Sequence, residues 1–132
     1  MDRNRLQPAL VEVRLPCGVV SVRREFNGRH WLDVEGAMRP ALRLREEADP
    51  QFTLCGAPPT HGILAGLAHE EHVSLEMPGS ERQDAVHGEG AWLLVVARER
   101  ISTAIEDGTL VTTGRDGEHR RPISSLQPFA VG

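Results

Sequence analysis

The sequence contains no lysine and no tyrosine, and asparagine occurs only at Asn4 and Asn27. All 15 basic residues are therefore arginine. The codons for lysine, tyrosine and asparagine are AT-rich, so a GC-rich genome is the simplest explanation of the bias. The bias excludes a Schiff-base lysine and a tyrosine acid or base from any catalytic mechanism.

Other scarcities disfavour whole classes of protein. Aromatic residues make up 4% of the chain, too few for a platform on which single-stranded nucleic acid stacks. The formal net charge of −4 argues against binding nucleic acid through a basic face. No apolar run approaches the ~18 residues that membrane insertion needs. Because "MDRNRLQPAL" also lacks the apolar stretch of a secretion signal, we expect a cytoplasmic protein, or an extracytoplasmic one if a leader has been removed.

The chain has two cysteines, Cys17 and Cys55, each followed by glycine, and their separation fits no paired-cysteine metal motif. Three interpretations remain open. The cysteines are small buried thiols in a reducing compartment, or they form a disulfide in an exported protein. The third interpretation is a nucleophile activated by histidine, a combination that chance also produces in many chains.

The dominant hydrophobic period is two, which is typical of half-buried strands. Val11 and Val13 alternate with polar neighbours, and Asn27-Gly28 separates two strand-like runs as a hairpin signal. At 132 residues we expect a single mainly β domain over residues 1–132, with residues 1–8 as a disordered N-terminus. About eight short strands joined by glycine-containing turns predict an antiparallel sandwich or barrel.

Individual segments have distinct predicted characters. "AWLLVVA" (91–97) is too continuously apolar for a strand wetted on one face, so we expect it at the centre of a sheet. We expect "ERQDAV" (81–86) to be a polar edge strand and "GAPPTHG" (56–62) to be a rigid loop. The alternation of Ile101, Thr103 and Ile105 predicts another strand.

Residues 39–49 are ambiguous. A short helix near residues 40–48, behind Pro40, competes with a strand that would carry Leu42 and Leu44. Pro50 stops either element.

The stretch "CGAPPTHGILAGLAHEEHVSLEMPGSERQDAVHGEGAWLLVVA", followed by "TLVTTGRDGEHRRPI", resembles a small β-sandwich-like domain common in proteins of high-GC Gram-positive bacteria. The resemblance runs from Cys55 to Ile123 and consists of strand and turn positions: Cys55, Gly66, Val73, Leu75, Gly79, Trp92 to Val96, and Asp116-Gly117. Where members carry Pro-Asp-Gly-Val before the first strand, this chain has "AHEEHV". The resemblance implies a sandwich fold and a role in display or contact, and it carries over no catalytic residues.

The histidines provide the candidate metal site. On a helix, His69 and His72 would share a face and bind zinc, but the strand pattern that follows them favours a solvated turn. His61, His87 and His119 adjoin glycine-containing turns, and the loops at one end of a sandwich would bring some of them to this pair. Zinc at His69, His72 and His61 is thus the alternative to a protein without a cofactor.

Strand edges provide the candidate partner surface, because exposed edges recruit partners by strand addition. The candidate contact residues are Glu81, Arg82, Gln83, Arg120 and Arg121. We therefore expect a noncatalytic β domain that contacts or regulates another protein or a second copy of itself, without partners among nucleic acids or membranes. The alternative is a small β-fold enzyme or a ligand- or metal-binding protein, with a pocket of histidines and arginines from loops at one end.

Overall fold

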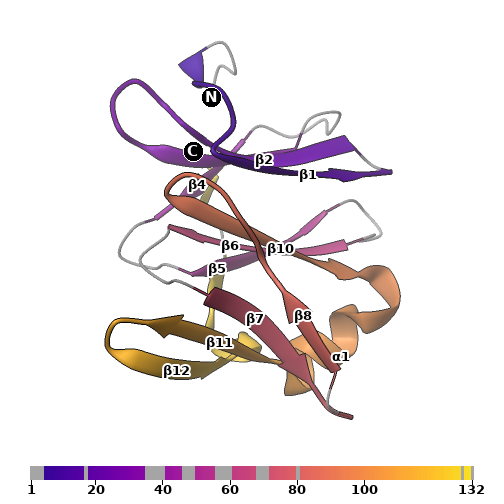
Figure 1. The fold of residues 1–132 in the computed structure, drawn as a ribbon. Coiled ribbons are helices and arrows are strands. Elements are labelled where there is room, and N and C mark those ends of the chain that lie inside the picture. Colours follow the sequence, from indigo (N-terminus) through magenta and orange to yellow (C-terminus); the bar gives the residue numbers. More distant parts are fainter. Residues whose placement is uncertain are drawn as a thin grey trace.

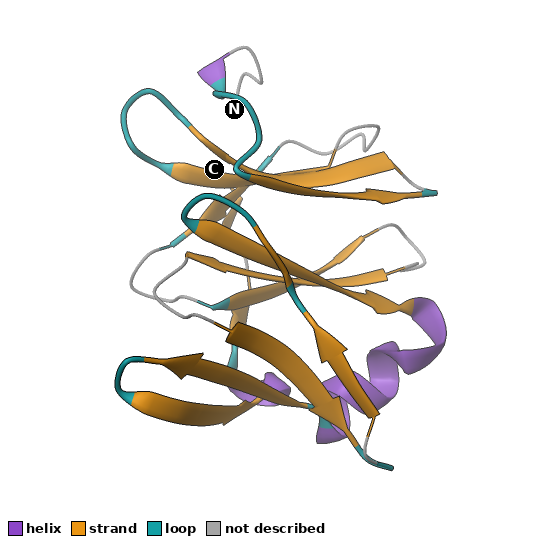
Figure 2. Cartoon of the chain, in the orientation of Figure 1, coloured by secondary structure: helices purple, strands orange, loops and turns teal. Residues whose placement is uncertain are grey.

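The computed structural model of the chain is mainly β, and its strands form three sheets that stack on one another (Figures 1 and 2). It describes residues 5–16, 18–34, 41–45, 50–55, 61–67, 72–79, 81–128 and 130–131. We call the sheets upper, middle and lower, from their order in Figure 1. The mainly β fold confirms the prediction, and the stacked sheets correspond to its sandwich alternative.

The upper sheet has the strand order β1 (Val11–Leu15), β2 (Gly18–Arg24), β3 (His30–Val34), β4 (Leu42–Leu44) and β14 (Ala130–Val131). The middle sheet has the order β13 (Gln127–Pro128), β5 (Gln51–Cys55), β6 (His61–Leu67), β10 (Ala91–Ala97) and β9 (Val86–His87). The lower sheet has the order β12 (Gly117–Pro122), β11 (Thr109–Gly114), β7 (His72–Met77) and β8 (Glu81–Asp84). Helix α1 (Ile101–Asp107) directly follows a 3-10 turn at Arg98–Arg100, and a second 3-10 turn, Ile123–Ser125, follows β12. Among the described strands, β13 and β5 are the one parallel pair.

The middle sheet is buried on both of its faces. Leu93, with the residues that share its face, packs against apolar side chains of the upper sheet in one cluster. Trp92 and Leu94, on the opposite face, pack against the lower sheet, α1 and Ile123 in a second cluster. Successive side chains of a strand point to opposite faces, so both halves of the alternation must be apolar in a sheet covered twice.

This double coverage explains the continuous apolar run of 91–97. The structure confirms that β10 is an inner strand, although the central position belongs to β6. β6 begins at His61 and Gly62, which the sequence assigns to the end of a rigid loop, so that assignment is wrong for these two residues. Gly62 fits the strand because a Cβ there would lie 3.1 Å from the ring of Phe52, which occupies the space instead.

The hairpin between β2 and β3 confirms the Asn27-Gly28 signal. Gly28 donates its N–H to the carbonyl of Glu25, and Glu25 donates to the carbonyl of Arg29, so the loop holds Phe26, Asn27 and Gly28. Gly28 has φ +92°, the left-handed conformation that closes a three-residue hairpin loop.

The strand alternative holds for the described part of the segment that the sequence leaves open, and the helix lies elsewhere. Residues 42–44, within the ambiguous segment, form strand β4, because Leu42 and Leu44 both face the core on either side of the less buried Arg43; residues 46–49 lie outside the described residues. Residues 101–107 form α1 instead of the predicted strand. The buried residues of α1 are Ile101 and Ala104, three apart as helical packing requires. No helix among the described residues is long and apolar enough to cross a bilayer.

The N-terminal segment 1–8, for which the sequence favours disorder, is described from Arg5 onward. Leu6 is buried in a small cluster with Trp31 and Ala41. Gln7 donates its N–H to the carbonyl of Arg24 at 2.8 Å, which ties this segment to the upper sheet.

Two consecutive residues of β10 test the three-layer arrangement. We expect Leu93→Ala and Leu94→Ala each to lower the free energy of unfolding by about 2–5 kcal/mol, because each leaves a cavity in a different core cluster. Urea denaturation measures both values. The control Phe26→Ala, at a side chain that is 78% exposed, should stay within about 0.5 kcal/mol of the parent. A two-layer molecule would give one costly and one neutral substitution in the Leu93/Leu94 pair.

Candidate functional site

Residues 81–87 belong to two sheets in succession. β8 pairs with β7 of the lower sheet, from Met77↔Glu81 to Ser74↔Asp84. Ala85 still donates its N–H to the carbonyl of Val73 at 2.9 Å. The next two residues form β9, which pairs with β10 of the middle sheet. The predicted edge strand therefore exists in the lower sheet, but the chain leaves that sheet before Val86.

The crossing leaves part of β10 uncovered. β9 pairs only with Trp92 and Leu93, and within the described part of the chain residues 94–97 have a strand partner on the β6 side alone. The turn after β9 is held tightly at its other end, because a Cβ on Gly88 would lie 1.9 Å from the carbonyl oxygen of Leu10. The gap beside residues 94–97 therefore lies between the turn at Gly88 and strand β8, which belongs to the lower sheet.

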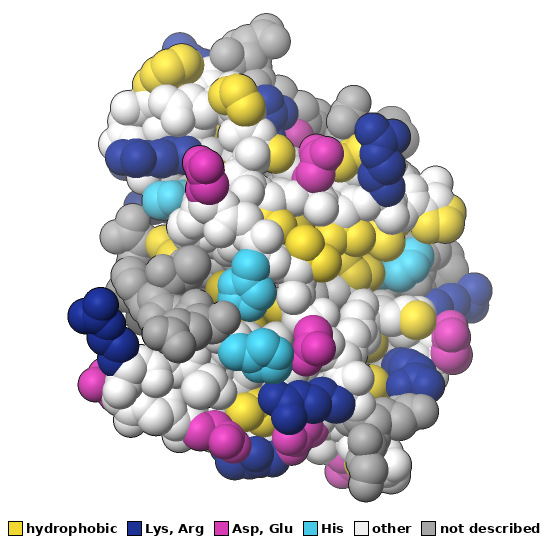
Figure 3. Space-filling model, viewed as in Figure 1, with side chains coloured by type: hydrophobic (Ala, Val, Ile, Leu, Met, Phe, Trp, Pro, Cys, Tyr) yellow, Lys and Arg dark blue, Asp and Glu magenta, His cyan; other side chains and the backbone are white. Residues whose placement is uncertain are grey.

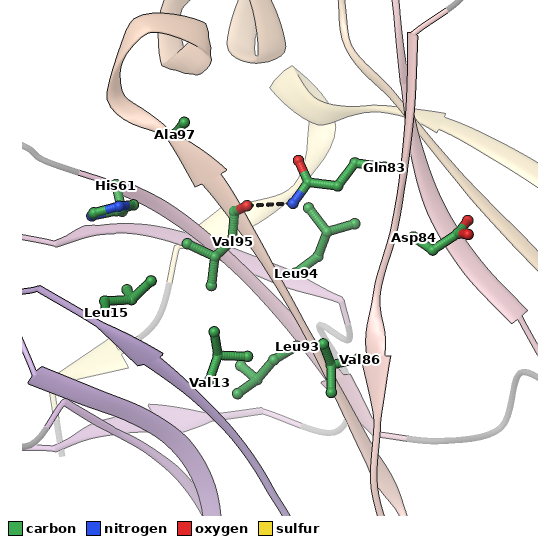
Figure 4. Close-up of a pocket in the computed structure, with 10 residues that line it drawn as sticks. All are labelled: Val13, Leu15, His61, Gln83, Asp84, Val86, Leu93, Leu94, Val95 and Ala97. Atoms are coloured by element: carbon green, nitrogen blue, oxygen red, sulfur yellow. Dashed lines mark hydrogen bonds between the residues drawn. The ribbon is translucent and has the colours of Figure 1, made fainter.

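A side chain occupies the place of the missing strand. Gln83, on β8, donates an amide N–H to the main-chain carbonyl of Val95, as the dashed line in Figure 4 shows. This carbonyl therefore points toward the gap, where the N–H of a neighbouring strand would otherwise meet it. Gln83 satisfies a main-chain group that would be costly to leave without a partner.

The gap opens into a hollow of about 320 Å³, which we call the edge groove. Most of its side chains are apolar and come from β1, β9 and β10, and Val86 is 48% exposed. Hydrophobic side chains form a band across the middle of this face of the molecule (Figure 3). The lining residues are Val13, Leu15, His61, Gln83, Asp84, Val86, Leu93, Leu94, Val95 and Ala97.

The described polar residues of the edge groove, Asp84, His61 and Gln83, lie apart from one another (Figure 4). The Asp84 side chain points away from the other lining residues in Figure 4, and its carboxylate lies 3.3 Å from Nε2 of His72. Nδ1 of His61 is buried and has no hydrogen-bond partner. Among the described residues that line the groove there is no serine or threonine, and Cys17 lies outside the described residues. The mostly apolar lining suits the groove to burying apolar surface.

The predicted metal ligands fall on different parts of the fold. His61 lines the edge groove, and His72 lies on the outer face of the lower sheet with Asp84, while His69 is outside the described residues. His87 and His119 lie on strands β9 and β12. Over the part of the chain that is described, no three histidine, cysteine, aspartate or glutamate side chains are grouped to hold a metal ion.

The outer face of the lower sheet carries a connected series of charges, which we call the charge ladder. Arg82 lies 3.9 Å from Asp84 and 4.0 Å from Glu76, and its Nε donates to Oγ of Ser74 at 3.0 Å. On the same face, Arg120 of β12 also contacts Glu76 and lies 2.7 Å from Glu118. Hydrogen bonds to Glu118 and Glu76 raise the pKa of Arg120 above its ordinary value.

Strand alternation divides the predicted contact residues. Arg82 and Arg120 lie in the charge ladder and already contact carboxylates. Gln83 and Arg121 are one residue further along and lie on the opposite face. Glu81 pairs with Met77 at the start of β8. The surface that includes Gln83, Val86 and the edge of β10 was not predicted as a unit.

The charge ladder should contribute little stability, because exposed ion pairs are screened by water and salt. We expect Glu76→Gln to lower stability slightly at about 10 mM salt and to match the parent at about 0.5 M salt, where the screening length is only a few ångströms. Thermal unfolding at the two salt concentrations measures the difference. Glu99→Gln, at an exposed glutamate outside the ladder, is the control and should show no salt-dependent loss. A Glu76→Gln loss that persists at high salt would contradict the expectation.

Comparison of the chain with protein-family models, curated proteins and solved structures gives no match. The resemblance to the sandwich-like bacterial domain therefore stays a prediction.

Proposed function

We propose that this protein is a noncatalytic β domain that binds an extended apolar segment of a partner protein in the edge groove. The observation that carries the proposal is the uncovered stretch of β10 at residues 94–97, with Gln83 bonded to the carbonyl of Val95. An incoming strand would take the position beside β10 that β8 leaves vacant. Strand addition of this kind supplies affinity through main-chain hydrogen bonds and selectivity through pockets for alternate side chains.

The dimensions of the edge groove support this mode of binding. Four residues of strand span about 13 Å, so the partner segment would be short. Its side chains would alternate between Val13, Leu15 and Val95 on one side and Leu94 on the other (Figure 4). Burial of apolar surface contributes roughly 25 cal/mol per Å², so this apolar lining favours an apolar occupant over a charged one.

The two edge strands of the lower sheet support the choice of the β10 edge. β8 and β12 present charged side chains on the outer face of the lower sheet, and charges on edge strands are a common protection against unwanted pairing. Val86 is one of the two large hydrophobic side chains that are exposed among the described residues, and the other, Phe26, lies in the β2–β3 hairpin loop. The pair offers a matched test.

We expect random peptides displayed on phage and selected on the parent protein to be enriched in alternating apolar residues. Val86→Asp should weaken binding of the selected peptides at least tenfold, whereas the control Phe26→Asp should leave it unchanged. Biolayer interferometry measures both affinities. In the peptide complex, hydrogen exchange should slow at the amides of Val95 and Ala97, whose main-chain groups face the gap.

Equal effects of Val86→Asp and Phe26→Asp, or protection that falls on β12 instead of β10, would overturn the proposal. Sedimentation of the parent protein over a range of concentrations tests a second copy as the partner. Self-association that Val86→Asp abolishes would identify the partner segment as part of the same chain.

A further inference from the structure

Adjacent arginines on β12 face in opposite directions. Arg120 pairs across the ladder with Val111 and lies in the charge ladder on the outer face. Arg121 pairs with Leu110, whose side chain is fully buried in the core below the middle sheet. Directly opposite residues share a face, so Arg121 and His119, two residues apart, lie on the inner face of the β11–β12 hairpin.

This inner face is hollow near the hairpin loop. A cavity of about 400 Å³ lies there, separate from the edge groove, and we call it the hairpin pocket. Gly114 pairs with Gly117 across the hairpin, and neither contributes a side chain to fill the space. The lining residues are Thr112, Gly114, Arg115, Asp116, Gly117, His119 and Arg121.

The lining of the hairpin pocket is rich in groups that bind anions. The described residues that line it include two arginines, His119, Thr112 and one carboxylate, that of Asp116. This described lining is positive on balance, on a chain with a formal net charge of −4. On the outer face the pattern is reversed, because Arg82 and Arg120 share the carboxylates of Glu76, Asp84 and Glu118.

We propose that the hairpin pocket binds the phosphoryl group of a small phosphorylated molecule. A guanidinium offers two parallel N–H donors to a phosphate, and Arg115 and Arg121 approach from the loop and from the strand. His119 and Thr112 supply further donors on the inner face. A phosphoryl group, with three terminal oxygens, can use these donors more fully than a carboxylate with two.

The size of the pocket and Asp116 point to an organic phosphate rather than the free ion. The volume of about 400 Å³ lies in the range of small-molecule sites, so room remains beyond the phosphoryl group. Asp116 would repel a second anion but would accept a hydrogen bond from a hydroxyl group of the ligand. This site is independent of the edge groove and of the function proposed for it.

The test uses the full chain and ribose 5-phosphate, inorganic phosphate, ribose and acetate as probes in amide-detected NMR titrations. Ribose 5-phosphate and inorganic phosphate should give saturable shifts at residues 112–121, with tighter binding of the ester, and ribose and acetate should give none. Arg121→Gln and Arg115→Gln should each weaken binding of ribose 5-phosphate at least tenfold. The control Arg120→Gln changes the neighbouring arginine on the other face and should leave the affinity unchanged.

Each alternative outcome decides against the site. Equal weakening by Arg121→Gln and Arg120→Gln would show only a general attraction of anions to β12. Acetate binding as tightly as inorganic phosphate would remove the phosphoryl group as the determinant, and the absence of saturable shifts would remove the site. Because Val86→Asp lies in the edge groove, that variant should bind ribose 5-phosphate like the parent, so failure of one proposal leaves the other intact.

Discussion

The molecule depends on the burial of both faces of one sheet. Leu93 and Leu94 are neighbours in sequence, yet each is enclosed by a different core cluster, one shared with the upper sheet and one with the lower sheet. A sheet covered on one face could leave every second side chain polar, whereas β10 of this sheet is apolar from Ala91 to Ala97. The outer sheets can then keep polar outward faces, and the charge ladder lies on one of these.

The sequence predicts the fold class because period-two patterning is strong wherever a sheet has one wet face. Val11 and Val13 in β1, and Val73, Leu75 and Met77 in β7, lie in strands as their alternation indicates. Hydrophobic patterning gives the wrong element where a short segment fits both the strand period of two and the helix period of 3.6. Ile101 and Ile105 fit both a strand and a helix, and only the burial of Ala104 between them shows the helical spacing. The start of β6 was assigned to a loop for another reason. In sequence Gly62 looks like a loop residue, whereas in the structure it leaves space for the Phe52 ring.

The candidate site was less predictable than the fold, because it depends on contacts distant in sequence. The polar character of 81–86 correctly indicates an edge strand, but no residue in it reveals that the chain changes sheets after Ala85. By sequence, Arg120 and Arg121 belong to one candidate contact surface, while only the register with Leu110 and Val111 shows that the two arginines face apart. The sequence identifies candidate contact residues, but only the strand pairing shows on which surface each of them lies.

The amide of Gln83 takes the place that a main-chain N–H of a neighbouring strand would have beside Val95. A strand that enters beside β10 must displace this amide from the carbonyl of Val95, so one hydrogen bond is exchanged for another and the count of satisfied groups hardly changes. Discrimination among competing sequences would then arise from the fit of side chains, since the backbone exchange is nearly neutral. In the absence of such a strand, the Gln83 amide covers part of the open edge of β10. It thereby disfavours unwanted edge-to-edge pairing with another copy of the protein.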